Sequence, residues 1–173
     1  VYTDYRPTPL VHYVFAAGLH LVVDEKGAFE EANFEKAMAQ LGGGEDPAAK
    51  LAKPQDDDLK RVIDLIVEKD MAPAIIFAFS RNECEANAVA LKKTDFNTDE
   101  ERDVVDAVYR SAMDSLSEED RRLPQVATLL PLLKRGVGIH HGGLLPIVKE
   151  VVEILFQEGL LKILFATETF AIG

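Results

Sequence analysis

The sequence lacks the features that predict disulfide bonds, a membrane-spanning helix or a signal peptide. It contains a single cysteine, Cys84, which excludes an intrachain disulfide framework and favours a reducing compartment. No apolar run approaches the ~20 residues that a membrane-spanning helix needs. The first residues also do not have the layout of a signal peptide. We therefore expect an intracellular, soluble domain with no membrane segment.

Positive charge is scarce as well. The chain has 19 Lys and Arg against 30 Asp and Glu, a formal net charge of −11. Binding to nucleic acid through a broadly basic surface relies on Lys and Arg, so the charge balance argues against that class and leaves only a local site open. The acidic residues gather in residues 56–58, 99–106 and 117–120, where helices are expected to start and carboxylates favour the helix dipole.

Several signatures of nucleotide enzymes are missing. The sequence has no G-x-x-x-x-G-K-[ST] phosphate loop, no G-x-G-x-x-G and no G-x-S-x-G. The 173 residues cannot form a self-sufficient nucleotide hydrolase, and we assign no catalytic residue among them.

Three apolar segments predict a parallel sheet. Residues 73–79 and 160–165 are nearly continuous apolar runs, which are typical of strands covered on both faces, and we interpret residues 73–79 as a central strand. Residues 136–140 form a third, glycine-bounded strand. Helical stripes lie between the strands, and residues 11–23 favour a hairpin. The pattern predicts an α/β layered, mostly parallel sheet with helices on both faces, an N-terminal hairpin and a linker at residues 42–55.

Polar residues follow each of the three predicted strands, at the edge where ligands bind in open α/β sheets. Ser80 doubles as a helix cap, with Glu83 three residues later. The candidates for this edge are Ser80, Arg81, His140, His141, Gly142, Gly143, Thr167 and Thr169.

The residues alone leave alternatives open at this edge. A metal at His140 and His141 is disfavoured, because adjacent side chains of a strand point to opposite faces. One histidine would pack under the sheet and the other cap the glycine turn, or His141 and the two glycine amides would meet a phosphate. The two threonines suit helix caps and a sugar-phosphate backbone equally well. Cys84 shares a helical face with apolar residues, which favours a buried thiol.

Four stretches, residues 1–15, 21–27, 73–85 and above all 138–173, closely resemble the second RecA-like domain of superfamily-two DExH-box RNA helicases. The group that the chain resembles most comprises the nuclear exosome-associated helicases of the TRAMP polyadenylation complex. The resemblance covers nearly the whole chain apart from the linker, and makes it one incomplete RecA-like domain.

This resemblance implies an ATP-dependent motor that moves along RNA in the 3′ to 5′ direction and feeds it to an exonuclease in the nucleus. ATP and Mg²⁺ would be held mainly by a first RecA-like domain that this sequence lacks. Exosome and TRAMP-type proteins are the implied partners. By the same resemblance RNA would contact Ser80, Arg81, His141, Gly142, Gly143, Thr167 and Thr169, and Gly173 would approach the nucleotide.

The sequence departs from the family by lacking the P-loop, the DExH segment and the arginine motif that stabilises phosphoryl transfer. We therefore expect the 173 residues alone to be inactive. The alternative hypothesis is a helicase-derived scaffold without enzymatic activity, whose acidic surface would suit basic protein partners.

Overall fold

The structure is a computed structural model that describes residues 8–41 and 56–172. The chain divides into two compact units, Val1–Val62 and Ile63–Gly173, and each is described by itself. The predicted linker at residues 42–55 lies outside the described residues.

The first unit holds the predicted hairpin. Strands β1 (His12–Phe15) and β2 (Leu19–Val23) pair antiparallel, which confirms the prediction. Helix α1 (Glu31–Leu41) packs on this hairpin and buries Ala37 completely. Helix α3 (Asp56–Glu68) includes the residues at which the two units meet in the sequence.

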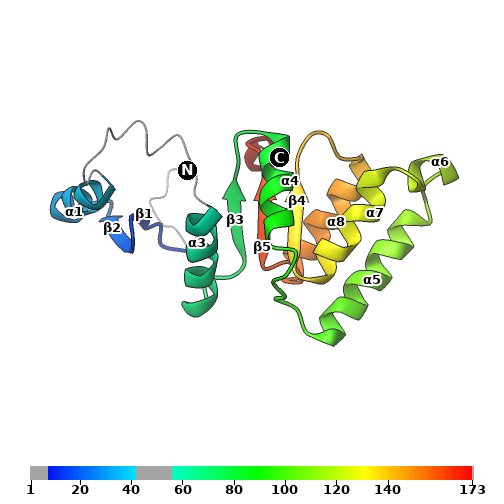
Figure 1. Cartoon of the computed structure of the whole chain (residues 1–173), viewed down its shortest axis with the longest axis horizontal. Helices are drawn as coiled ribbons and strands as arrows, with labels where there is room; N and C mark the ends of the chain where they lie inside the picture. Colours follow the sequence, from blue (N-terminus) through cyan, green and yellow to red (C-terminus); the bar gives the residue numbers. More distant parts are fainter. Residues whose placement is uncertain (1–7, 42–55, 173) are drawn as a thin grey trace, which may run out of the picture. The chain divides into compact units, whose positions relative to one another are not determined.

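The second unit is built on a parallel sheet of three described strands: β3 (Ala74–Phe77), β4 (Val137–His140) and β5 (Ile163–Ala166). Their order is β3-β5-β4, and the predicted α/β class with parallel strands is confirmed. Phe77 and His140 both lie in register with Ala166. The carboxyl ends of the strands are therefore level, and they face upward in Figure 1.

One prediction about this sheet is wrong. The apolar run at residues 73–79 forms an edge strand, not a central one, because among the described strands β5 is the one that pairs on both sides. All four residues of β5 are buried, whereas Ile75 and Phe77 of β3 are exposed. A continuous apolar run predicts a strand that needs cover on both faces, but it carries no information on which neighbours flank it.

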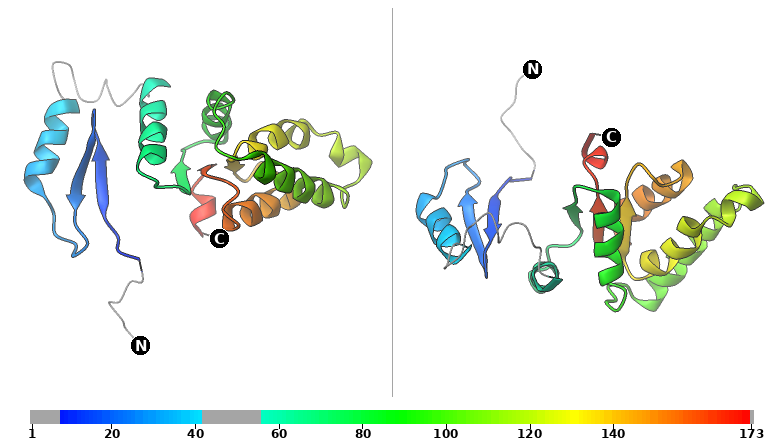
Figure 2. Two further views of the ribbon diagram at one scale, coloured as in Figure 1. Left: turned by 90° about the horizontal axis from the view of Figure 1, so that it is seen from below. Right: turned by 45° about the horizontal axis from the view of Figure 1, so that its top comes forward.

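Helices cover both faces of the sheet, as the sequence predicted (Figure 1, Figure 2). Helix α4 (Arg81–Ala90) lies on one face and α8 (Pro146–Gln157) on the other. The neighbouring side chains of His140 and His141 establish this, since they point to opposite faces and reach α8 and α4 respectively. The remaining helices are α5 (Asp99–Met113), α6 (Glu118–Arg121), α7 (Pro124–Lys134) and α9 (Thr169–Ile172).

Local capping explains where two of these helices begin. The Thr98 hydroxyl accepts the Glu101 N–H and the Glu101 carboxylate accepts the Thr98 N–H, so α5 begins with a complete capping box. At α4 the Ser80 hydroxyl accepts the Glu83 N–H as predicted. The Glu83 carboxylate, however, accepts the N–H of Phe79, one residue before the position that a capping box uses.

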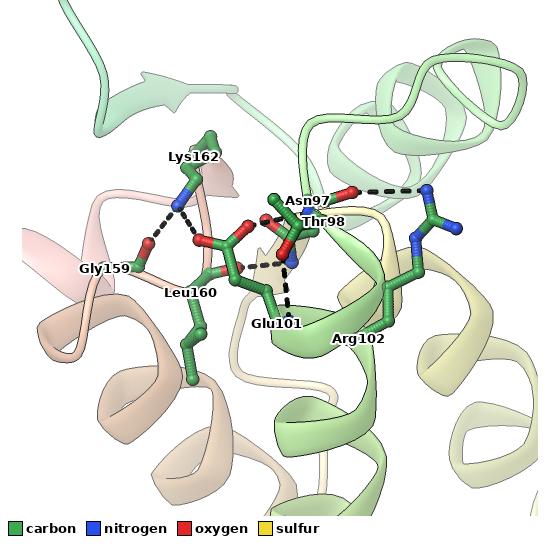
Figure 3. A network of polar contacts seen from close by, with 7 residues as sticks. All are labelled: Asn97, Thr98, Glu101, Arg102, Gly159, Leu160 and Lys162. Carbon is green, nitrogen blue, oxygen red and sulfur yellow. Dashed lines mark hydrogen bonds and ion pairs between the residues drawn. The ribbon is translucent and has the colours of Figure 1, made fainter.

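A polar network ties the start of α5 to the loop before β5 (Figure 3). The Asn97 amide donates to the carbonyl of Leu160 at 2.9 Å. The Lys162 ammonium donates to Glu101 at 2.8 Å and to the carbonyl of Gly159 at 2.6 Å. These contacts lie at the amino ends of the strands, so they fix the sheet from the side opposite the candidate site.

Gly136, which precedes β4, has a φ of +82° and sits against this network. A β-carbon there would lie 2.7 Å from Asn97 Oδ1 and 3.2 Å from Phe96 Cβ, so Gly136→Ala adds a clash to backbone strain. We expect it to lower the unfolding free energy by about 2–4 kcal/mol. Equilibrium urea unfolding of the chain measures this.

Gly159→Ala is the matched control, because Gly159 has a φ of +72° but no atom within 4 Å of the added carbon. Strain alone should cost it about 1–2 kcal/mol. If the two variants lower the unfolding free energy equally, Asn97 does not hold the backbone at Gly136 rigidly.

Candidate nucleic-acid interface

Backbone hydrogen bonds bring the three predicted turns to one edge of the sheet. The N–H of Ala78, just past β3, donates to the carbonyl of Ala166 at 2.9 Å. The N–H of Thr167, just past β5, donates to the carbonyl of His140 at 3.2 Å. The segments that follow the three strands therefore start side by side at the carboxyl edge.

The side chain of Arg81 lies over the double-glycine turn that follows β4. A β-carbon added at Gly142 would lie 3.4 Å from Arg81 Nη2, and one added at Gly143 would lie 3.3 Å from Arg81 Cδ. Glycine permits this approach because it has no side chain. The N-terminus of α4 and the glycine turn thus lie next to each other, and the exposed guanidinium of Arg81 covers the turn.

His141 is buried beneath this turn and is only 3% exposed. Its Nδ1 accepts the N–H of Gly143 at 3.1 Å, and its Nε2 lies 3.2 Å from Glu85 Oε1. Because Nδ1 is an acceptor, we assign the ring proton to Nε2, which donates to Glu85. This is the arrangement in which a histidine caps the glycine turn, and it leaves neither the ring nor the Gly143 amide directed at a ligand.

The two threonines differ in exposure. Thr167 is 6% exposed, and its Oγ1 lies 3.0 Å from that of Thr169. Its carbonyl accepts the N–H of Phe170 in the first turn of α9. Thr169, in contrast, is exposed at the start of α9. Thr167 therefore supports the turn from inside, and Thr169 presents the hydroxyl that a ligand can reach.

The predicted site residues fall into two groups by position. The exposed candidates are Ser80, Arg81, Gly142, Gly143 and Thr169, and the buried ones are His141 and Thr167. Gly173 lies outside the described residues. Sequence reasoning missed Phe79, which is 99% exposed at the same edge and borders a pocket with Phe77, Glu168 and Ala171. It was counted with the apolar strand, and nothing in the run distinguishes it.

The charges at the carboxyl edge favour contact with an anionic group at one point and not along a broad surface. Arg81 and the amino end of α4 supply positive potential at one point. The exposed carboxylates of Glu85 and Glu168 limit how far that potential extends. Ser80 uses its oxygen to accept the Glu83 N–H, and its own hydroxyl hydrogen can still be donated.

The described residues hold neither a metal-binding cluster nor a membrane-spanning helix. Within residues 8–41 and 56–172, no three His, Cys, Asp or Glu side chains are grouped so as to hold a metal ion. No helix in the same residues is long and apolar enough to cross a membrane. Cys84 is completely buried, as the helical pattern predicted.

Burial lowers the pKa of His141 from its ordinary value, and the neighbouring Glu85 carboxylate opposes that shift. The unfolded chain thus binds this proton more readily than the folded one. The stabilisation linked to neutral His141 is present above the unfolded pKa of about 6.5 and is lost as pH falls through the folded pKa.

We expect an NMR titration of the His141 ring to give a pKa below about 6.5. Glu85→Gln should lower it further, because the variant removes the carboxylate that favours the imidazolium. A pKa above the ordinary value, or one that Glu85→Gln raises, would contradict the buried, neutral ring.

Comparison with known proteins extends along the whole chain. The human protein named Exosome RNA helicase MTR4 is 54% identical over 182 residues, covering 100% of this chain and 18% of the human protein. The ATP-dependent RNA helicase mtr4 of Schizosaccharomyces pombe is 52% identical, again over 100% of the chain and over 17% of that protein. The DExH-box ATP-dependent RNA helicase DExH9 of Arabidopsis thaliana is 50% identical over 100% of the chain and 19% of its own length.

No model of a protein family matches the chain. The chain spans less than a fifth of the length of these curated relatives, but its similarity to them has no gap at either end. The identity averages 50–54% over alignments that cover the whole chain, so the relationship is not confined to a short motif. The chain belongs to the DExH-box RNA helicases, in the group that includes the MTR4 proteins.

Proposed function

We propose that the chain is the second RecA-like domain of an ATP-dependent RNA helicase that acts in exosome-linked RNA processing, and that its carboxyl edge contacts the RNA backbone. One observation carries the RNA contact: the guanidinium of Arg81 lies across the Gly142-Gly143 turn at the edge where the three strands end. The names of the relatives support the wider activity.

The exposed groups at this edge fit phosphates and sugars more closely than bases. Arg81 supplies a charged donor that lies over the Gly142 turn, and the hydroxyls of Ser80 and Thr169 add neutral donors. Backbone contacts of this kind hold RNA without reading its sequence, which suits a motor that moves along it. A local site also agrees with a net charge of −11 over the whole chain.

ATP binding belongs to the same proposal. ATP and Mg²⁺ would be held mainly by a first RecA-like domain, and the nucleotide would draw the two domains together on RNA. Gly173, predicted to approach the nucleotide, lies beyond the described residues. By the same proposal the protein translocates 3′ to 5′, works in the nucleus and has exosome and TRAMP-type partners.

A protein-binding scaffold is the second candidate, and the acidic charge favours it. Such a scaffold would use the carboxylates and the exposed Phe79 at the rim to hold a basic, apolar partner. It would neither hydrolyse ATP in response to RNA nor separate strands. Assays of both activities on the full-length protein therefore separate the two candidates.

We expect Arg81→Gln in the full-length protein to weaken RNA binding about tenfold. The slope of log K against log salt concentration should also fall, by the amount that corresponds to about one lost phosphate contact. Fluorescence anisotropy at several salt concentrations measures both quantities. The matched control is Arg122→Gln, which removes the same charge from an exposed arginine that follows α6 as its C-cap and pairs with Glu118.

The control should leave RNA affinity and salt dependence unchanged. If Arg81→Gln and Arg122→Gln behave alike, the carboxyl edge does not hold the RNA backbone. If the affinity falls but the salt dependence does not, Arg81 does not contact a phosphate.

A further inference from the structure

We propose that His140 is a positioning residue for RNA binding: it fixes the start of α9 and thereby the exposed hydroxyl of Thr169. This inference rests on the proposed function, because it concerns how the RNA contact at Thr169 is held in place. His140 itself is 7% exposed and is not a contact residue.

Three contacts converge on His140, from α8, from α9 and from the turn between β5 and α9. Its Nε2 lies 2.7 Å from Glu153 Oε1 in α8. Its ring meets the ring of Phe170 in α9 edge-on, with 4.8 Å between the centroids. Its backbone carbonyl accepts the N–H of Thr167 at 3.2 Å. The residue therefore links β4, α8 and the turn that carries the threonines.

Of these three contacts, the one with Phe170 affects the position of Thr169. Phe170 follows Thr169 directly, so the position of its ring limits where the Thr169 hydroxyl can point. The ring of Phe170 also packs edge-on against Phe156 of α8, at 6.3 Å. A helix of four residues has little stability of its own, so these tertiary contacts must hold α9 in place.

Glu153 orients the imidazole for that contact. Within the described part of the chain, the buried Nδ1 of His140 has no hydrogen-bond partner, so the bond at Nε2 is the ring's only polar tie. An aliphatic side chain at this position would lose both the bond to Glu153 and the aromatic edge against Phe170. The turn below Thr169 would then sample other positions while the sheet remains paired.

The test is a set of variants in the full-length protein, with RNA affinity, RNA-free ATPase rate and melting temperature measured for each. His140→Leu should raise the RNA dissociation constant about fivefold, and Phe170→Leu should do the same. Glu150→Gln is the matched control. Glu150 is exposed and lies about one turn before Glu153 in α8, so the variant should leave RNA affinity, ATPase rate and melting temperature unchanged.

The deciding measurement repeats His140→Leu in a Thr169→Ala background. If His140 acts through Thr169, its effect on RNA affinity disappears there, while any change in melting temperature remains. A fivefold effect that persists in that background would overturn the inference, because the role would then be general stability. Should His140→Leu fail to fold, Phe170→Leu takes its place in the same cycle.

The failure of this inference can be told from the failure of the proposed function. If Arg81→Gln and Thr169→Ala both leave RNA affinity unchanged, the proposed RNA contact is wrong and the positioning role is overturned with it. If these two variants weaken binding but His140→Leu and Phe170→Leu do not, the RNA contact stands and the positioning role alone is overturned.

Discussion

The parallel register of β3 and β4 on β5 is the constraint on which the rest of the second unit depends. Ala166 lies opposite Phe77 on one side and His140 on the other, so the strands end at the same level. Three turns that are far apart in the sequence then begin at one edge. A shift of β3 or β4 by one residue would turn its side chains to the opposite face and separate Arg81 from the glycine turn.

The paired histidines show how one strand supports two different layers. His140 points toward α8 and stabilises α9, and His141 points toward α4 and caps the glycine turn. Both rings are buried, and each is bonded to a carboxylate of a helix on its own side. Two buried rings therefore lie beneath the carboxyl edge, on which Arg81 and Thr169 are exposed.

Local features of the fold could be predicted from the sequence because their causes are local. Thr98 and Glu101 lie three residues apart and cap one helix, and Gly159 supplies the positive φ that ends another. The buried strand at β5 follows from its apolar run. Strand order does not follow from such a pattern, so the edge position of β3 and the exposure of Phe79 were not predicted.

The candidate site was predicted as a set of positions but not as a set of exposed groups. The rule that ligands bind at the carboxyl edge located the three turns, since it depends only on where strands end. Which side chains face solvent depends on contacts across 56 residues, such as that between Glu85 and His141, and no spacing reveals these. His141 and Thr167 lie buried beneath the turns, whereas Arg81 lies exposed over the glycines.

The central claim, that RNA backbone lies along this edge, is tested most directly by photo-cross-linking uniformly labelled RNA to the full-length protein and mapping the attached peptides by mass spectrometry. We expect cross-links in peptides that contain Arg81, Gly142 and Thr169, and their loss when unlabelled RNA competes. Specific cross-links confined to α5, α6 and α7, with none at the carboxyl edge, would contradict it.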